Sequence, residues 1–138
     1  MILDGFDGLN WLAVIVATVA WFAFSSIWYS APPISAAWQQ AAKVTATGEG
    51  PPLAVILVPT FVGYFVTTVA IALVAGGIGA SDFADGIALG VVLGLGFGVV
   101  GALIGQLYEQ KGSSYWLLNG VNAIIAYSIV GAIVSVWD

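Results

Sequence analysis

A glycine-rich stretch in the last third of the chain, GLGFGVVG at residues 94–101, contains the spacing Gly-x-Gly-x-x-Gly. With Gly96, Gly98 and Gly101 in these places, a tight turn could approach the pyrophosphate of a dinucleotide. That use requires a strand before the motif, a soluble helix after it and an acidic residue about 20 positions further on. Apolar residues flank this stretch on both sides, so we assign its glycines to a membrane helix instead.

A second group of reactive side chains lies at a short polar turn, where Ser113 and Ser114 follow Glu109 and Lys111. A serine nucleophile needs an adjacent general base, and a lipid-modifying site also needs groups that bind phosphate. The chain has no Cys, His or Arg, which removes the commonest bases, metal ligands and phosphate binders. We therefore predict no catalytic, cofactor-binding or metal-binding residues, and a simple turn at a membrane edge.

The composition is that of a membrane protein. Of the 138 residues, 61% are hydrophobic and 7% are charged, and the mean hydropathy is +1.07, whereas a soluble domain has about 25% charged residues. Two lysines and seven acids cannot cover a surface exposed to water. The net charge of −5 argues against a nucleic-acid partner. We expect the surface to face the lipid bilayer.

Four apolar segments are long enough, at about 20 residues each, to cross the roughly 30 Å hydrocarbon core as helices. We predict membrane spans near 9–29, 53–75, 87–108 and 115–137, in a single domain covering residues 1–138. The predicted fold class is all-α integral membrane, with four transmembrane helices in an antiparallel bundle. The first segment is expected to remain as a span, because Asp4 and Asp7 precede it where a signal peptide would have basic residues.

Orientation follows from the two basic residues, Lys43 and Lys111, which fall in the first and third connections between spans. Basic residues accumulate in cytoplasmic loops. We therefore expect both of these connections in the cytoplasm and both termini outside.

The first connection begins with prolines that end the first span, and Ser35 can cap a short helix after them. Ile34, Trp38, Ala41 and Ala42 share one side of this helix. We predict that it is a short interfacial helix, which lies on the membrane between the first and second spans.

Aromatic residues gather near the ends of the spans, where amphipathic rings suit the headgroup level. Trp28, Tyr29 and Trp38, together with Ser30, form the most compact such group. A cage of aromatic rings around a cationic ligand is the alternative interpretation.

Glycines recur along one side of the third span. At about 100° per residue, six of them fall within roughly a third of the helix circumference, and Gly96 lies away from them. A face of small residues lets a neighbouring helix approach closely in a membrane, and the neighbour can belong to the same chain or to a second copy. The predicted helix-packing residues are Gly86, Gly90, Gly94, Gly98, Gly101 and Gly105.

Polar side chains mark an interior face on two other spans: Thr60 and Thr67 on the second, and Asn119 and Asn122 on the fourth. They can join helices by hydrogen bonds. Alternatively, they line a path or pocket for a neutral solute, an ion or a lipid headgroup, with a backbone carbonyl freed by Pro59 as a ligand. No charged residue lies in the middle of any span, which disfavours a proton relay or charge-coupled transport.

The order of these features resembles the family of small prokaryotic membrane proteins named domain of unknown function 1761. Its first span begins Asn-Trp-Leu-Ala-Val and ends Trp-Tyr-Ser-Pro, as at residues 10–14 and 28–30 here, although the proline is delayed to Pro32. A later Asp-Gly, Trp-Leu with a following Asn, and Gly-Ala-Ile match residues 85–86, 116–119 and 131–133. The resemblance implies a four-span protein of the prokaryotic cytoplasmic membrane and brings no established activity.

Two functions are compatible with the sequence. The first is a non-catalytic membrane protein that acts through helix packing, as a homo-oligomer or as an accessory subunit of a larger membrane complex. The alternative is a small channel or transporter for a neutral or weakly charged solute. Neither hypothesis requires a cofactor.

Overall fold

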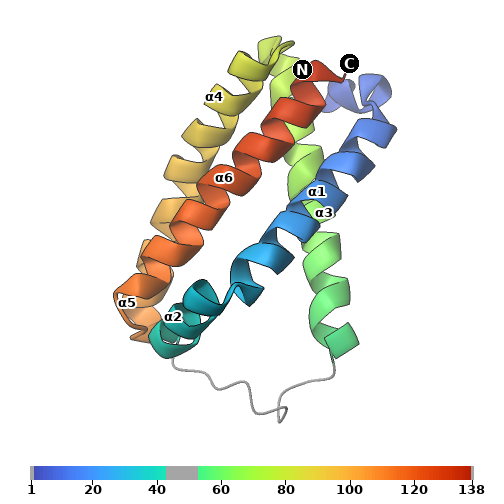
Figure 1. Cartoon of the computed structure of the whole chain (residues 1–138). Helices are drawn as coiled ribbons and strands as arrows, with labels where there is room; N and C mark the ends of the chain where they lie inside the picture. Colours follow the sequence, from blue (N-terminus) through green and yellow to red (C-terminus); the bar gives the residue numbers. More distant parts are fainter. Residues whose placement is uncertain (1, 43–52, 138) are drawn as a thin grey trace.

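The computed structural model describes residues 2–42 and 53–137, and Figure 1 shows their arrangement. All regular structure in these residues is helical. In chain order the elements are the 3₁₀ helix η1 (Ile2–Gly8), α1 (Trp11–Ser30), α2 (Pro32–Ala42), α3 (Leu53–Ile78), α4 (Phe83–Leu93), the π-helical segment η2 (Gly94–Val99), α5 (Val100–Glu109) and α6 (Ser114–Val136). The predicted all-α fold class is confirmed.

Four helical stretches are long and apolar enough to cross a membrane. The third of them combines α4, η2 and α5. Their bounds are Trp11–Ser30, Ala54–Ile78, Phe83–Glu109 and Ser114–Val136. The four predicted long apolar helices are therefore confirmed, with ends displaced by only a few residues.

Consecutive long helices run in opposite directions (Figure 1). The first and last described residues lie at one end of the bundle, which we call the terminal end. From there α1 runs to the opposite end, α3 returns, α4 to α5 run away again and α6 comes back. The short helix α2 lies at the opposite end, beside the turn between α5 and α6.

Local sequence determines where these helices begin and end. The Asn10 side chain accepts a hydrogen bond from the Ala13 backbone nitrogen at 3.1 Å and so caps the start of α1. Proline disfavours helical backbone at the residue before it, and Ala31 before Pro32 is extended, with a ψ of 126°. The third span ends at Gln110, which adopts a left-handed conformation with a φ of 56°.

The third span is not a continuous α-helix, because Gly94–Val99 form a π-helical segment. A π segment closes hydrogen bonds five residues apart and accommodates one additional residue. Every residue after it is therefore rotated by about 100° from the position that an uninterrupted α-helix would give it.

The centre of the bundle is closed by aromatic rings. Trp21 of α1 stacks on Tyr64 of α3, with ring centroids 4.0 Å apart, and meets the edge of Tyr127 of α6 at 5.5 Å. Small and aliphatic side chains from α1, α3, α4 and α6 fill the space around these rings. The buried residues of this core are Ala17, Trp21, Ile71, Ala75, Leu89, Ala126 and Val130.

The apolar side of α2 is turned toward the rest of the protein. The backbone nitrogen of Gly112 donates to the carbonyl of Ala41 at 2.6 Å, and Nζ of Lys111 donates to the carbonyl of Ala42 at 2.8 Å. Both alanines are buried. The turn between α5 and α6 thus satisfies carbonyls that the end of a helix leaves free. That α2 also lies at the membrane interface stays a prediction.

Candidate functional site

Four of the six glycines singled out in the third span lie directly against α6. A methyl group at Gly94 would stand 2.7 Å from Cα of Ile124, and at Gly90 it would overlap the backbone of Ser128. At Gly86 it would overlap the backbone of Gly131, and at Gly98 the methyl group of Ala123. The α4–α6 contact is the most extensive between any two described helices. It is a contact of backbone on backbone within one chain.

Gly101 and Gly105 do not lie on this contact. A methyl group at Gly101 would meet nothing within 4 Å, and one at Gly105 would meet only Oε2 of Glu109, in the same helix, at 3.7 Å. The π segment is the reason, since its extra residue moves the inward positions of α5 one residue along the chain. Ala102, the residue after Gly101, is half-buried, whereas Gly101 is exposed. The expected face of six glycines therefore ends at Gly98.

A polar cluster joins three helices at the end opposite the termini. The hydroxyl of Tyr29 donates to Oδ1 of Asn119 at 2.5 Å, and Nε1 of Trp38 donates to the same oxygen at 3.2 Å. The two rings meet edge to face with centroids 5.8 Å apart. We call Tyr29, Trp38 and Asn119 the Asn119 cluster. It fixes the ends of α1 and α2 onto α6, using residues that the sequence analysis assigned to two separate groups.

The other residues of the aromatic group do not enter this cluster. The ring of Trp28 packs against Phe24 at 5.8 Å, and its indole nitrogen is buried without a hydrogen-bond partner. Ser30 is exposed, and its hydroxyl donates to the carbonyl of Ser26 at 2.5 Å within α1.

The remaining polar residues are dispersed. Nδ2 of Asn122 donates to the hydroxyl of Ser25 at 3.4 Å, and both side chains are buried. Thr60 donates to the carbonyl of Ile56 in its own helix at 2.6 Å, and Thr67 is half-buried with no hydrogen bond from its side chain. The structure thus brings Asn119 and Asn122 into contact with α1 but does not join them to the threonines.

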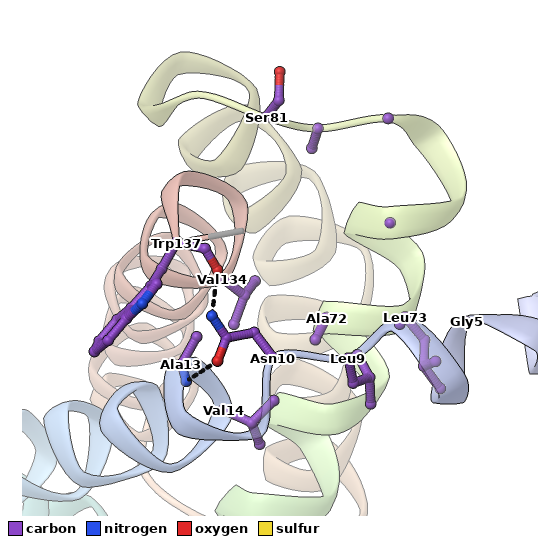
Figure 2. A pocket seen from close by; sticks show the side chains of 14 residues that line it. Gly5, Leu9, Asn10, Ala13, Val14, Ala72, Leu73, Ser81, Val134 and Trp137 are labelled. Carbon is purple, nitrogen blue, oxygen red and sulfur yellow. Dashed lines mark hydrogen bonds between the residues drawn. The ribbon is translucent and has the colours of Figure 1, made fainter.

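Two hollows flank the aromatic centre. One, of about 300 Å³, opens at the terminal end between α1, α3 and α6 (Figure 2). The other, of about 250 Å³, is a groove between Phe22, Ser25 and Tyr29 of α1 and Leu57, Thr60 and Tyr64 of α3. Their linings share no residue.

The turn that carries Ser113 and Ser114 packs against α2. Lys111 donates to α2 as described, and neither serine hydroxyl bonds to Glu109 or Lys111. Among residues 2–42 and 53–137, no three His, Cys, Asp or Glu side chains come together as a metal ion would require.

Sequence reasoning missed three contributors to these contacts. Asn10 was noted only as part of a motif, yet it caps α1 and donates from Nδ2 to the carbonyl of Trp137 at 3.2 Å. An Asn directly before an apolar run is a helix-cap signal that could have revealed the first role. The stacking of Trp21 and the pairing of Ser25 depend on contacts between distant segments, for which the sequence has no local signal.

Four apolar spans and a core that contains no charged side chain among the described residues define a small four-span integral membrane protein. Residues 12–135 match the family described as Protein of unknown function (DUF1761), and the chain belongs to that family. The resemblance found in the sequence is thereby confirmed. No curated protein and no solved structure matches the chain.

Proposed function

We propose that the protein is a non-catalytic component of the prokaryotic cytoplasmic membrane that acts through helix packing, as a homo-oligomer joined along α3. The observation that carries this proposal is the exposure of α3. Residues 54–59 and 61–63, in its first half, are all exposed, and Val58 and Val62 are 61% and 53% exposed. Of the four spans, α3 contributes the smallest share of its residues to the interior.

The exposed side of α3 contains small residues at helical spacing. Pro59, Gly63, Ala70 and Gly77 are exposed and fall within about 40° of one another at 100° per residue. A methyl group at Gly63 or Gly77 would meet nothing within 4 Å. A glycine destabilises a helix by about 1 kcal/mol relative to alanine, and contact with lipid does not offset this loss. Close packing of a second helix against the glycine would offset it.

A second copy is the partner that this surface fits best. The outward face of α3 has no charged residue among those described, so it has no group that would select a partner of complementary charge. Two identical faces can pack on each other around a two-fold axis parallel to the membrane normal.

The channel alternative has weaker support. Asn119, Asn122 and Thr60 direct hydrogen bonds to other protein groups, and Trp21, Tyr64 and Tyr127 close the centre between the two hollows. An open path for a solute would have to displace these rings.

Charge at the two ends supports the orientation with both termini outside. Asp4, Asp7, Asp82 and Asp85 lie in the elements of the terminal end, whereas Lys111 lies at the opposite end. Lys43, the other basic residue, lies outside the described residues. Glu109 also lies at that opposite end, but the positive-inside rule counts basic residues, so the position of Lys111 supports a cytoplasmic location for that end.

The proposal is tested by the mass of the protein released from lipid nanodiscs in native mass spectrometry. The unaltered chain should give dimers or larger assemblies, and Gly63→Leu should weaken assembly at least tenfold, which corresponds to about 1.4 kcal/mol. Gly101→Leu is the matched control, because Gly101 is equally open but lies on α5. A monomeric native chain, or a second protein in place of the second copy, would overturn the homo-oligomer.

A further inference from the structure

The hollow at the terminal end has the features of a ligand site, and we call it the end cavity. It lies where α1 begins, α3 turns into α4 and α6 ends (Figure 2). Its volume of about 300 Å³ is at the lower limit of typical small-molecule pockets. Gly5 and Gly8 come from η1, Asn10 from the start of α1, Gly76 from α3, Gly79 from the α3–α4 turn, and Trp137 from the end of α6.

The cavity exists because small residues meet there. Four glycines and three alanines are among the residues that line it. A methyl group added at Gly8 or Gly76 would meet no atom within 4 Å. The inner part of the lining includes Ala13 and Val14, each 1% exposed, and the buried core lies beyond them. It is therefore a blind pocket that opens at one end of the protein.

A polar group with unused hydrogen-bonding capacity lies in this pocket. Oδ1 of Asn10 accepts from Ala13, and Nδ2 donates to the carbonyl of Trp137 (Figure 2). A primary amide has two donor hydrogens and two acceptor lone pairs. One of each is left for a ligand, and Asn10 is only half-buried, so a ligand can reach them.

Acidic residues are adjacent in the chain to the lining of the cavity. Asp4, Asp7 and Asp82 directly neighbour Gly5, Gly8 and Ser81, and Oδ1 of Asp82 also accepts from the backbone nitrogen of Asp85. Lys111, the basic residue that the structure describes, lies at the opposite end. Carboxylates near the mouth of a low-dielectric pocket attract a cation.

We propose that the end cavity binds an ammonium group, carried either by a small soluble amine or by the headgroup of an amine-bearing phospholipid. The oxygen of Asn10 accepts a hydrogen bond from the ammonium, the neighbouring carboxylates favour its charge, and the glycine and alanine walls accept the short carbon chain attached to it. This role is independent of the α3 contact.

The test uses the full chain in nanodiscs of phosphatidylglycerol, which has no amine. Ethanolamine binding is followed by saturation-transfer NMR, and retention of phosphatidylethanolamine mixed into the same nanodiscs is followed by native mass spectrometry. Binding of ethanolamine supports a soluble amine, and selective retention of phosphatidylethanolamine alone supports the lipid headgroup. If neither probe binds in preference to phosphatidylglycerol, the proposal is overturned.

Two open glycines provide the matched variants. A methyl group at Gly76 or at Gly96 would meet nothing within 4 Å, but only Gly76 lines the cavity. Gly76→Phe should weaken binding of the effective probe at least tenfold, and Gly96→Phe should leave it unchanged. If Gly76→Phe does not fold, Gly8→Phe fills the cavity from η1. Native affinity in a folded, cavity-filled variant would contradict the proposal.

Discussion

The oxygen of Asn119 serves two donors at once, which makes it the most connected polar atom described between the helices. Tyr29 and Trp38 reach it from α1 and α2, and each would leave a polar hydrogen without a partner if the amide were removed. Hydrogen bonds between membrane helices contribute about 0.6 kcal/mol on average and ~1.7 at most. The cluster therefore specifies how α1, α2 and α6 meet more than it stabilises the bundle.

Removal of this oxygen should produce a measurable and non-additive loss. We expect Asn119→Ala to lower the free energy of unfolding by about 1–2 kcal/mol, followed by denaturation in mixed micelles. Tyr29→Phe should lower the free energy of unfolding by less in the Asn119→Ala variant, because the hydrogen bond between the two side chains is already absent there. Thr60→Val is the control, since Thr60 bonds within its own helix. Strict additivity of Tyr29→Phe and Asn119→Ala would show that the two side chains do not interact.

At the scale of elements, the π segment decides which glycines have a partner. Gly86 and Gly90 precede it, Gly94 and Gly98 lie within it, and all four contact α6, whereas Gly101 and Gly105 follow it and do not. The glycine pattern by itself contains no signal for a π turn. A prediction that assumes 100° per residue therefore fails at the residues after Val99.

The two classes of glycine should respond oppositely to alanine. Gly90→Ala forces a methyl group into the backbone of Ser128, so α4 must move away from α6, and we expect a loss of about 2 kcal/mol or more. Gly101→Ala meets nothing and should be neutral or stabilise the helix by up to about 1 kcal/mol. Unfolding in mixed micelles measures both. Similar effects at the two positions would contradict the assigned contact.

Much of the architecture follows from the sequence, because apolar length determines a span and prolines determine where α1 ends. The four spans were predicted and observed on these grounds. The partners of the polar residues were not predictable, since Tyr29 and Asn119 are 90 positions apart in the chain. The end cavity was not predictable either, because it is lined by small residues of four separate segments that only the fold brings together.

At the scale of the whole molecule, orientation can be measured directly because the chain has no cysteine. Ser81 and Ser113 are exposed serines at opposite ends of the third span. In intact cells, a membrane-impermeant maleimide should label Ser81→Cys, and it should label Ser113→Cys only after the membrane is opened. Labelling of both from one side would contradict the four-span topology, and the reverse pattern would contradict the proposed orientation.

The central claim is that α3 joins two copies of the chain. Around a two-fold axis, a residue on the contact lies opposite its own counterpart, and cysteines form a disulfide when their Cα atoms are within about 7 Å. Mild oxidation of native membranes that contain Gly63→Cys should therefore produce a covalent dimer, whereas Gly101→Cys should remain monomeric. A covalent dimer from Gly101→Cys alone would contradict the α3 contact, and so would the absence of a dimer from both variants.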